Sequence, residues 1–158
     1  MMTKKHIVLV AALLCTSAPL IAQQTEPFKG RWEAVFTPPK VVSSSPPTWF
    51  ILGQGSGEAT PTAHFTITIP HTVNLLTLHL AGNWFISPAG DNGHDVIMID
   101  LDEQCQFTSQ TTAVCAGTGT ISSGTGNYLN ATGSISIHVD IDVAALTASG
   151  VFDGTITR

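Results

Sequence analysis

The sequence has little positive charge. Its 158 residues include six Lys and Arg against eleven Asp and Glu, for a formal net charge of −5. Two of the six basic side chains, Lys4 and Lys5, lie at the N-terminus, and the other four form no cluster. A phosphate-binding surface needs clustered Lys and Arg, and attraction to anionic lipid needs the same. The composition therefore argues against nucleic acid and against an anionic membrane surface as partners.

Long apolar runs are also missing. The longest, residues 7–14, falls short of the roughly 20 residues that span a membrane as a helix. Lys4 and Lys5 precede this run, and small residues follow it as far as Ala22. A basic start, a short apolar stretch and a small residue before the cut are typical of a secretory signal peptide.

We therefore predict a signal peptide over residues 1–22 and one domain over residues 23–158. The mature protein is then secreted or periplasmic, without membrane insertion, and loss of two lysines lowers its formal net charge to −7. A lipoprotein site at Cys15 is disfavoured, because small residues should precede the cysteine and Leu13 and Leu14 are large.

Cysteine is scarce. Cys15 lies in the predicted leader, which leaves Cys105 and Cys115. An even pair in an exported chain predicts a disulfide, and a turn at residues 109–111 would place the two opposite each other on neighbouring strands. A metal site would need more ligands than two thiolates, and the sequence has no Cys-x-x-Cys motif. We predict a Cys105–Cys115 disulfide and no cofactor.

Thr, Ser, Gly and β-branched residues are abundant, in short runs without an apolar period of 3.6 or helix caps. Such runs predict antiparallel strands. The predicted strands cover residues 30–36, 49–52, 62–69, 73–80, 83–87, 94–101, 104–108, 112–121, 133–143 and 150–157. They favour an all-β fold, a single antiparallel β-barrel of about eight strands, with a β-sandwich as the alternative. Four prolines within residues 37–47 predict a loop over one end of the barrel.

The segments 62–69 and 73–80 predict a hairpin with a short turn between them. Pairing residues whose numbers sum to 143 builds one continuous apolar face, and it sets His64 opposite His79 on the other face. Neutral imidazoles on neighbouring strands can share a metal ion, although polar fillers of a half-solvated sheet show the same pattern. His64 and His79 are therefore an alternative to the expectation that the protein holds no metal.

Glycines frame residues 124–133, which read Gly-Thr-Gly-Asn-Tyr-Leu-Asn-Ala-Thr-Gly. Directly after them, polar and apolar residues alternate strictly up to residue 143, as in a strand with one buried face. Gly124, Gly126 and Gly133 suit a backbone that needs positive φ or close approach. The pattern predicts a structural corner rather than a chemical site.

This corner and strand resemble the late-barrel corner of the allene oxide cyclase-like and dirigent-like β-barrels, including small bacterial secreted relatives. The glycine-rich residues 53–57 add weaker support. The resemblance implies a β-barrel whose corner is architectural and whose activity depends on cavity residues that differ between members. It also implies acidic residues with arginines inside the barrel, and beyond the leader this chain has only Arg31 and Arg158.

Aromatic side chains are the candidates for a ligand site. They can line a cavity for an apolar ligand, or they can fill the barrel as its own core. The candidates are Trp32, Trp49, Trp84, Phe85 and Tyr128.

Acidic and histidine clusters form a second group of candidates, suited to acid–base chemistry or calcium. The members are His138, Asp140 and Asp142 on one strand, and His94, Asp95, Asp100, Asp102 and Glu103 around another. A solvent-facing sheet surface shows the same alternation without chemistry. No Gly-x-Ser-x-Gly motif is present either, so the sequence assigns no side chain a catalytic role and leaves the catalytic residues unknown.

These patterns favour an exported, non-catalytic β-barrel that binds a small apolar ligand or has a structural role in the envelope or outside the cell. The alternative is a cyclase or isomerase, in which the barrel confines a hydrophobic substrate in one reactive conformer. A buried polar cluster beside an open cavity would favour the enzyme, and a filled barrel would favour the structural role.

Overall fold

The computed structural model describes residues 23–90 and 93–158, so the predicted signal peptide lies outside the described residues. Within these ranges the chain forms nine β-strands and one short 3₁₀ turn. They are β1 (Thr25–Phe36), β2 (Lys40–Ser44), β3 (Pro47–Thr60), β4 (Ala63–Asn74), β5 (His79–Pro88), β6 (Val96–Phe107), β7 (Thr112–Thr125), η1 (Gly126–Tyr128), β8 (Thr132–Asp142) and β9 (Thr147–Thr157). In these two ranges, no helix is long and apolar enough to cross a membrane.

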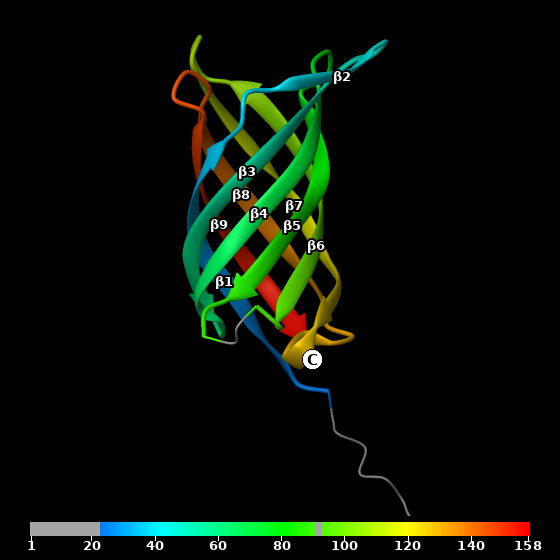
Figure 1. The fold of residues 1–158 in the computed structure, drawn as a ribbon, viewed down its shortest axis with the longest axis vertical. Helices are drawn as coiled ribbons and strands as arrows, with labels where there is room; N and C mark the ends of the chain where they lie inside the picture. The colour runs from blue at the N-terminus through cyan, green and yellow to red at the C-terminus, as the bar shows by residue number, and fades with distance from the viewer. Residues whose placement is uncertain (1–22, 91–92) are drawn as a thin grey trace, which may run out of the picture.

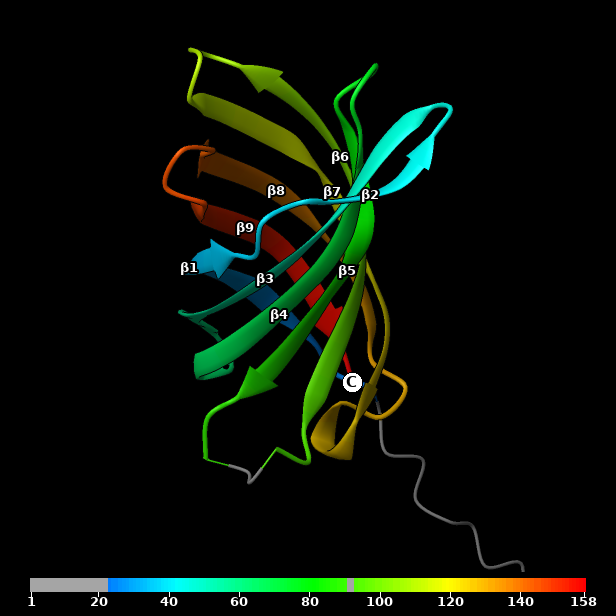
Figure 2. The same ribbon diagram turned by 45° about the horizontal axis from the view of Figure 1, so that its top comes forward.

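The strands form one antiparallel sheet that closes on itself (Figure 1). Their order is β1-β9-β8-β7-β6-β5-β4-β3-β2, and the additional pairing of β1 with β3 closes a barrel of eight strands. The one described strand outside the barrel, β2, pairs with β3 and projects from it as a hairpin (Figure 2). The predicted all-β barrel of about eight strands is confirmed, and the sandwich alternative is wrong.

The two ends of the barrel carry different connections (Figure 1). One end, the mouth, carries β2 and the β4–β5, β6–β7 and β8–β9 turns. The other end, the base, carries the β3–β4, β5–β6 and β7–β8 connections and both ends of the described chain. There Gln24 and Arg158 exchange two backbone hydrogen bonds, of 2.8 and 3.0 Å.

Aromatic side chains fill the middle and the base of the barrel. Trp32 of β1 and Trp84 of β5 meet edge to face, with ring centroids 5.3 Å apart. Phe28 of β1 packs on Phe152 of β9 at 4.9 Å. Gly150 makes room for this cluster, because a Cβ there would lie 2.8 Å from the Trp32 ring. Side chains, rather than open space, therefore occupy this part of the interior.

The glycine-framed corner lies at the base, between β7 and β8. Gly126 has a φ of +58°, and a Cβ there would collide with the Asp95 carboxylate. That carboxylate accepts hydrogen bonds from the Asn127 backbone N–H at 2.8 Å and from Asn127 Nδ2 at 2.7 Å. Gly124 and Gly133 face backbone so closely that a side chain would collide with it. A buried acid on the β5–β6 connection thus ties the corner to the neighbouring hairpin.

The predicted register of the β4–β5 hairpin is wrong. The numbers of the paired residues sum to 153, as for His79 opposite Asn74 at the mouth. His64 lies towards the base, opposite Glu58 of β3. The two histidines are therefore at opposite ends of the hairpin, and the predicted cross-strand pair that could share a metal ion does not form.

Turn chemistry explains this difference. Asn74 Oδ1 accepts hydrogen bonds from the backbone N–H groups of Leu76 and Thr77, at 2.9 and 3.3 Å, and so places the turn at residues 75–78. Pro70, which the sequence places in the turn, continues β4. Registers that differ by an even number keep every side chain on the same face. Alternation alone could not choose between them.

Two predicted boundaries are also corrected. The strands expected at residues 94–101 and 104–108 are one continuous strand, β6, so Glu103 lies within a strand. The loop expected over residues 37–47 contains β2, which pairs with the start of β3.

The predicted Cys105–Cys115 disulfide is confirmed. The two cysteines are directly opposed on β6 and β7, with an S–S distance of 1.99 Å.

Candidate functional site

A cavity of about 260 Å³ opens at the mouth of the barrel. Its wall comes from strands around the barrel and from the mouth turns, and it is almost entirely apolar. If each non-hydrogen atom of a ligand takes about 30 Å³, as a water molecule does, the cavity holds on the order of ten such atoms. The wall residues used below are Phe36, Trp49, His71, Val73, Leu78 and Leu146.

Wider hollows, of about 600 to 720 Å³, lie on the outer wall and are open to solvent. An exposed ion pair lines one of them, with Arg31 Nη2 3.2 Å from the Glu58 carboxylate, and His64 Nδ1 lies 3.4 Å from the same carboxylate. His138 and Asp140 lie on the same outer wall, 4.0 Å apart. Exposed pairs of this kind contribute little stability, and an almost wholly apolar cavity suits a small apolar ligand better than wider hollows open to solvent.

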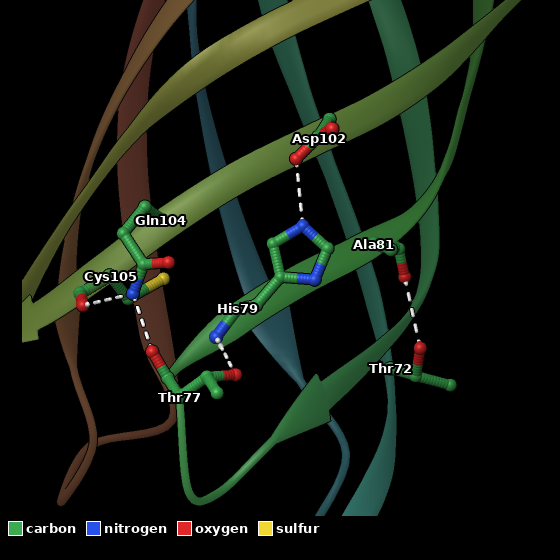
Figure 3. A network of polar contacts seen from close by, with 7 residues as sticks. All are labelled: Thr72, Thr77, His79, Ala81, Asp102, Gln104 and Cys105. Carbon is green, nitrogen blue, oxygen red and sulfur yellow. Dashed lines mark hydrogen bonds and ion pairs between the residues drawn. The ribbon is translucent and has the colours of Figure 1, made fainter.

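His79 also lies on the outer wall (Figure 3). Its Nε2 is 2.7 Å from Asp102 Oδ1 on the neighbouring strand β6. Gln104 continues this polar edge, because its Nε2 donates to the carbonyl oxygen of Thr77 at 2.6 Å. Among the described residues, no group of three or more His, Cys, Asp or Glu is arranged to hold a metal ion.

The aromatic candidates separate into different places. Trp49 lines the cavity. Trp32 and Trp84 belong to the buried core, and Tyr128 is buried in the base corner. Phe85 is half-buried on the outer face of β5, between the buried Trp84 and the next inward residue. Sequence reasoning missed the two phenylalanines of the wall, Phe36 and Phe107, because each lies at or next to the end of a predicted strand.

Two leucines at the rim adopt an unusual backbone conformation. Leu78 has a φ of +55° and Leu146 a φ of +56°, a region uncommon for residues other than Gly, Asn and Asp. Their turns share one construction, in which Asn74 or Asp142 accepts two backbone N–H groups through its side-chain oxygen. Left-handed backbone costs roughly 1–2 kcal/mol for such residues. This backbone conformation places an apolar side chain, Leu78 or Leu146, in the cavity wall at each turn.

His71 is the buried polar side chain of the cavity wall, only 6% exposed. Its Nδ1 lies 3.3 Å from the carbonyl oxygen of Ile69, and the Phe36 ring meets the imidazole edge to face at 5.6 Å. Gly82 provides the space, since a Cβ there would lie 2.6 Å from the His71 Cβ. Burial lowers the pKa of His71 to about 4, so the ring is neutral at pH 7.

Glu103 is a buried acid deeper in the barrel, only 3% exposed. It lies on the inner face of β6, one inward position below Cys105, and opposite the wall residue Leu80. Burial raises the pKa of Glu103 to about 7, and no hydrogen bond from the described residues offsets this effect. The sequence placed Glu103 with the solvated acids because the expected strand ended before it.

No protein-family model matches the chain, and no curated protein matches its sequence. A solved structure matches its fold: the pterocarpan synthase dirigent protein GePTS1 aligns with a TM-score of 0.59 and 13% identity, over 94% of this chain and 99% of that chain. The chain has a dirigent-like barrel fold. At this identity the likeness concerns the fold alone. The dirigent-like part of the sequence resemblance is thus confirmed for the fold, and the allene oxide cyclase-like part stays a prediction.

Proposed function

We propose that this dirigent-like barrel is an exported, non-catalytic protein that binds a small apolar molecule at its mouth. One observation carries the proposal: the barrel is filled by aromatic side chains towards its base, yet it keeps an apolar cavity of about 260 Å³ at its mouth. Burial of an apolar ligand there would contribute about 25 cal/mol for each Å² removed from water. The leader pattern of residues 1–22 and the disulfide support export.

A neutral ligand fits this site better than an anion. Among the described residues, neither Lys nor Arg lines the cavity, and the chain carries a formal net charge of −5. The neutral His71 and the apolar wall also offer an ion little solvation.

The test is binding of butylbenzene, an apolar probe of suitable size, measured by isothermal calorimetry and by the shift in melting temperature. In Val73→Phe, the larger side chain fills part of the cavity, so we expect binding at least about tenfold weaker. Val151→Phe makes the same change on the exposed outer face of β9 and should bind as the wild type does. Unchanged binding by Val73→Phe would place the ligand elsewhere, and no binding by the wild type would favour a structural role.

A cyclase or isomerase is the second candidate, in line with the allene oxide cyclase-like resemblance. Glu103 favours it, because a buried carboxyl with a pKa of about 7 can both hold and release a proton at neutral pH. The test is NMR of a bound ligand before and after incubation with protein. An isomer formed by the wild type but not by Glu103→Gln would establish catalysis, whereas an unchanged ligand would support simple binding.

A further inference from the structure

His71 offers a hydrogen-bond acceptor to the cavity. A carbonyl oxygen only accepts, so the contact of Nδ1 with the Ile69 carbonyl at 3.3 Å assigns the proton of the neutral ring to Nδ1. The other ring nitrogen, Nε2, then carries a lone pair. This tautomer is fixed by the backbone of β4 itself, two residues from the histidine.

Nε2 has no protein partner among the described residues. The enclosed side-chain nitrogen and oxygen atoms that lack a partner in the described chain are Trp32 Nε1 and Thr62 Oγ1. Nε2 is not one of them, so it reaches open space, and the space that His71 borders is the cavity at the mouth. An acceptor with a free lone pair therefore lies in an otherwise apolar wall.

The imidazole is also held in place. Phe36 packs edge to face against it at 5.6 Å, and the absence of a side chain at Gly82 leaves room for the His71 Cβ that carries the ring. A positioned acceptor in an apolar site discriminates between ligands, because the ligand that lacks a donor leaves the acceptor unpaired.

We propose that His71 Nε2 accepts a hydrogen bond from the ligand, and that the cavity selects small apolar molecules carrying one hydroxyl group. The apolar body of such a molecule lies against Trp49, Val73 and the rim leucines, and its hydroxyl reaches the inner wall. This inference rests on the proposed binding function and adds the chemical class of the ligand.

Three isosteric probes test the selection: 3-phenylpropan-1-ol, benzyl ethyl ether and butylbenzene. They have the same chain length, and only the alcohol can donate a hydrogen bond. By calorimetry at pH 7, after correction for each probe's transfer from water to hydrocarbon, we expect the alcohol to bind about three- to tenfold tighter than the ether and the hydrocarbon.

Two variants assign this preference to His71. His71→Phe keeps an aromatic ring but has no acceptor, and it should bind all three probes alike after the same correction. His71→Gln keeps an acceptor oxygen near the position of Nε2 and should retain part of the preference. Variants are compared only after circular dichroism shows that they are folded.

The outcomes separate the two proposals. If the wild type binds the three probes equally well, or if His71→Phe keeps the preference for the alcohol, the role of His71 is overturned while the binding function stands. If the wild type binds none of them, both proposals are overturned. Tighter binding of a carboxylate such as 4-phenylbutanoate than of the alcohol would also overturn the selection for a neutral donor.

Discussion

At the scale of single residues, burial acts on His71 and Glu103 in opposite directions. Both lose solvation inside the barrel, which disfavours their charged forms, so the pKa of His71 falls to about 4 and that of Glu103 rises to about 7. His71 therefore weakens the fold as pH falls below its ordinary pKa of 6.5, and Glu103 weakens it as pH rises above its ordinary pKa of 4.5.

Glu103→Gln should remove the loss of stability that the buried Glu103 carboxyl causes as pH rises. Between pH 4.5 and about 7 the unfolded wild type releases the Glu103 proton while the folded protein keeps it, so wild-type stability falls as pH rises. The variant should thus gain stability relative to the wild type across this range, by on the order of 2–3 kcal/mol at pH 8. Urea unfolding at several pH values measures it. A pH-independent difference between the two proteins would show that Glu103 titrates normally.

The sequence reveals part of the site at this scale. Trp49 could be proposed as a wall residue because aromatic side chains are suited to apolar ligands. His71 and Glu103 could not, because their burial depends on the hairpin register and on β6 running without a break. Whether a polar residue is buried can be judged only when its neighbours on the adjacent strands are known.

At the scale of elements, the hairpin turns set the register between neighbouring strands, which the alternation of apolar and polar residues does not define. Strand positions and inward faces follow from the apolar pattern, as in β8, where Ile135, Ile137 and Val139 are buried. The register of β4 on β5 follows from Asn74, whose side chain caps the turn. Sequence alone also cannot show that leucines occupy left-handed positions, since Gly or Asn is the usual choice there.

Leu78→Gly tests why a leucine occupies such a position. Glycine removes backbone strain and also removes apolar contacts, so the free energy of unfolding should change by less than about 1 kcal/mol. Butylbenzene binding should weaken several-fold, because the cavity loses part of its rim. Thermal melts and calorimetry measure the two quantities. A large loss of stability without loss of binding would make Leu78 a packing residue instead.

Gly126→Val tests the corner at the base. The residue has a φ of +58°, and its Cβ would collide with the Asp95 carboxylate that holds Asn127. We expect a loss of at least about 1–2 kcal/mol of unfolding free energy, with ligand affinity of the folded fraction unchanged. A variant that melts as the wild type does but no longer binds butylbenzene would make the corner a functional site.

At the scale of the whole molecule, the two ends of the closed barrel differ: the base is packed, and the mouth is open. The base is packed with aromatic rings and carries the corner, whereas the mouth carries the cavity and the two turns with left-handed leucines, Leu78 and Leu146. The resemblance to dirigent-like barrels came from the base corner, which belongs to the fold. The walls of the mouth depend on side chains that a fold does not fix, which is why the sequence predicted the barrel and not its site.

The disulfide joins β6 and β7 close to the mouth, and its contribution concerns the whole unfolding transition. Closing a loop of ten residues constrains the unfolded chain, so the double variant Cys105→Ala, Cys115→Ala should lose about 2–3 kcal/mol. Chemical denaturation of the variant, and of reduced wild type as the matched control, measures this. An equal midpoint for reduced and oxidised wild type would contradict it.

Both ends of the described chain lie side by side at the base, joined by the hydrogen bonds of Gln24 with Arg158. Anything attached at either end, whether a tether, a label or another domain, would hold the barrel with its opening turned away from the attachment point. A molecule immobilised in this way would keep its cavity accessible. Two copies fused end to end would present their openings on opposite sides, so both could be occupied at once.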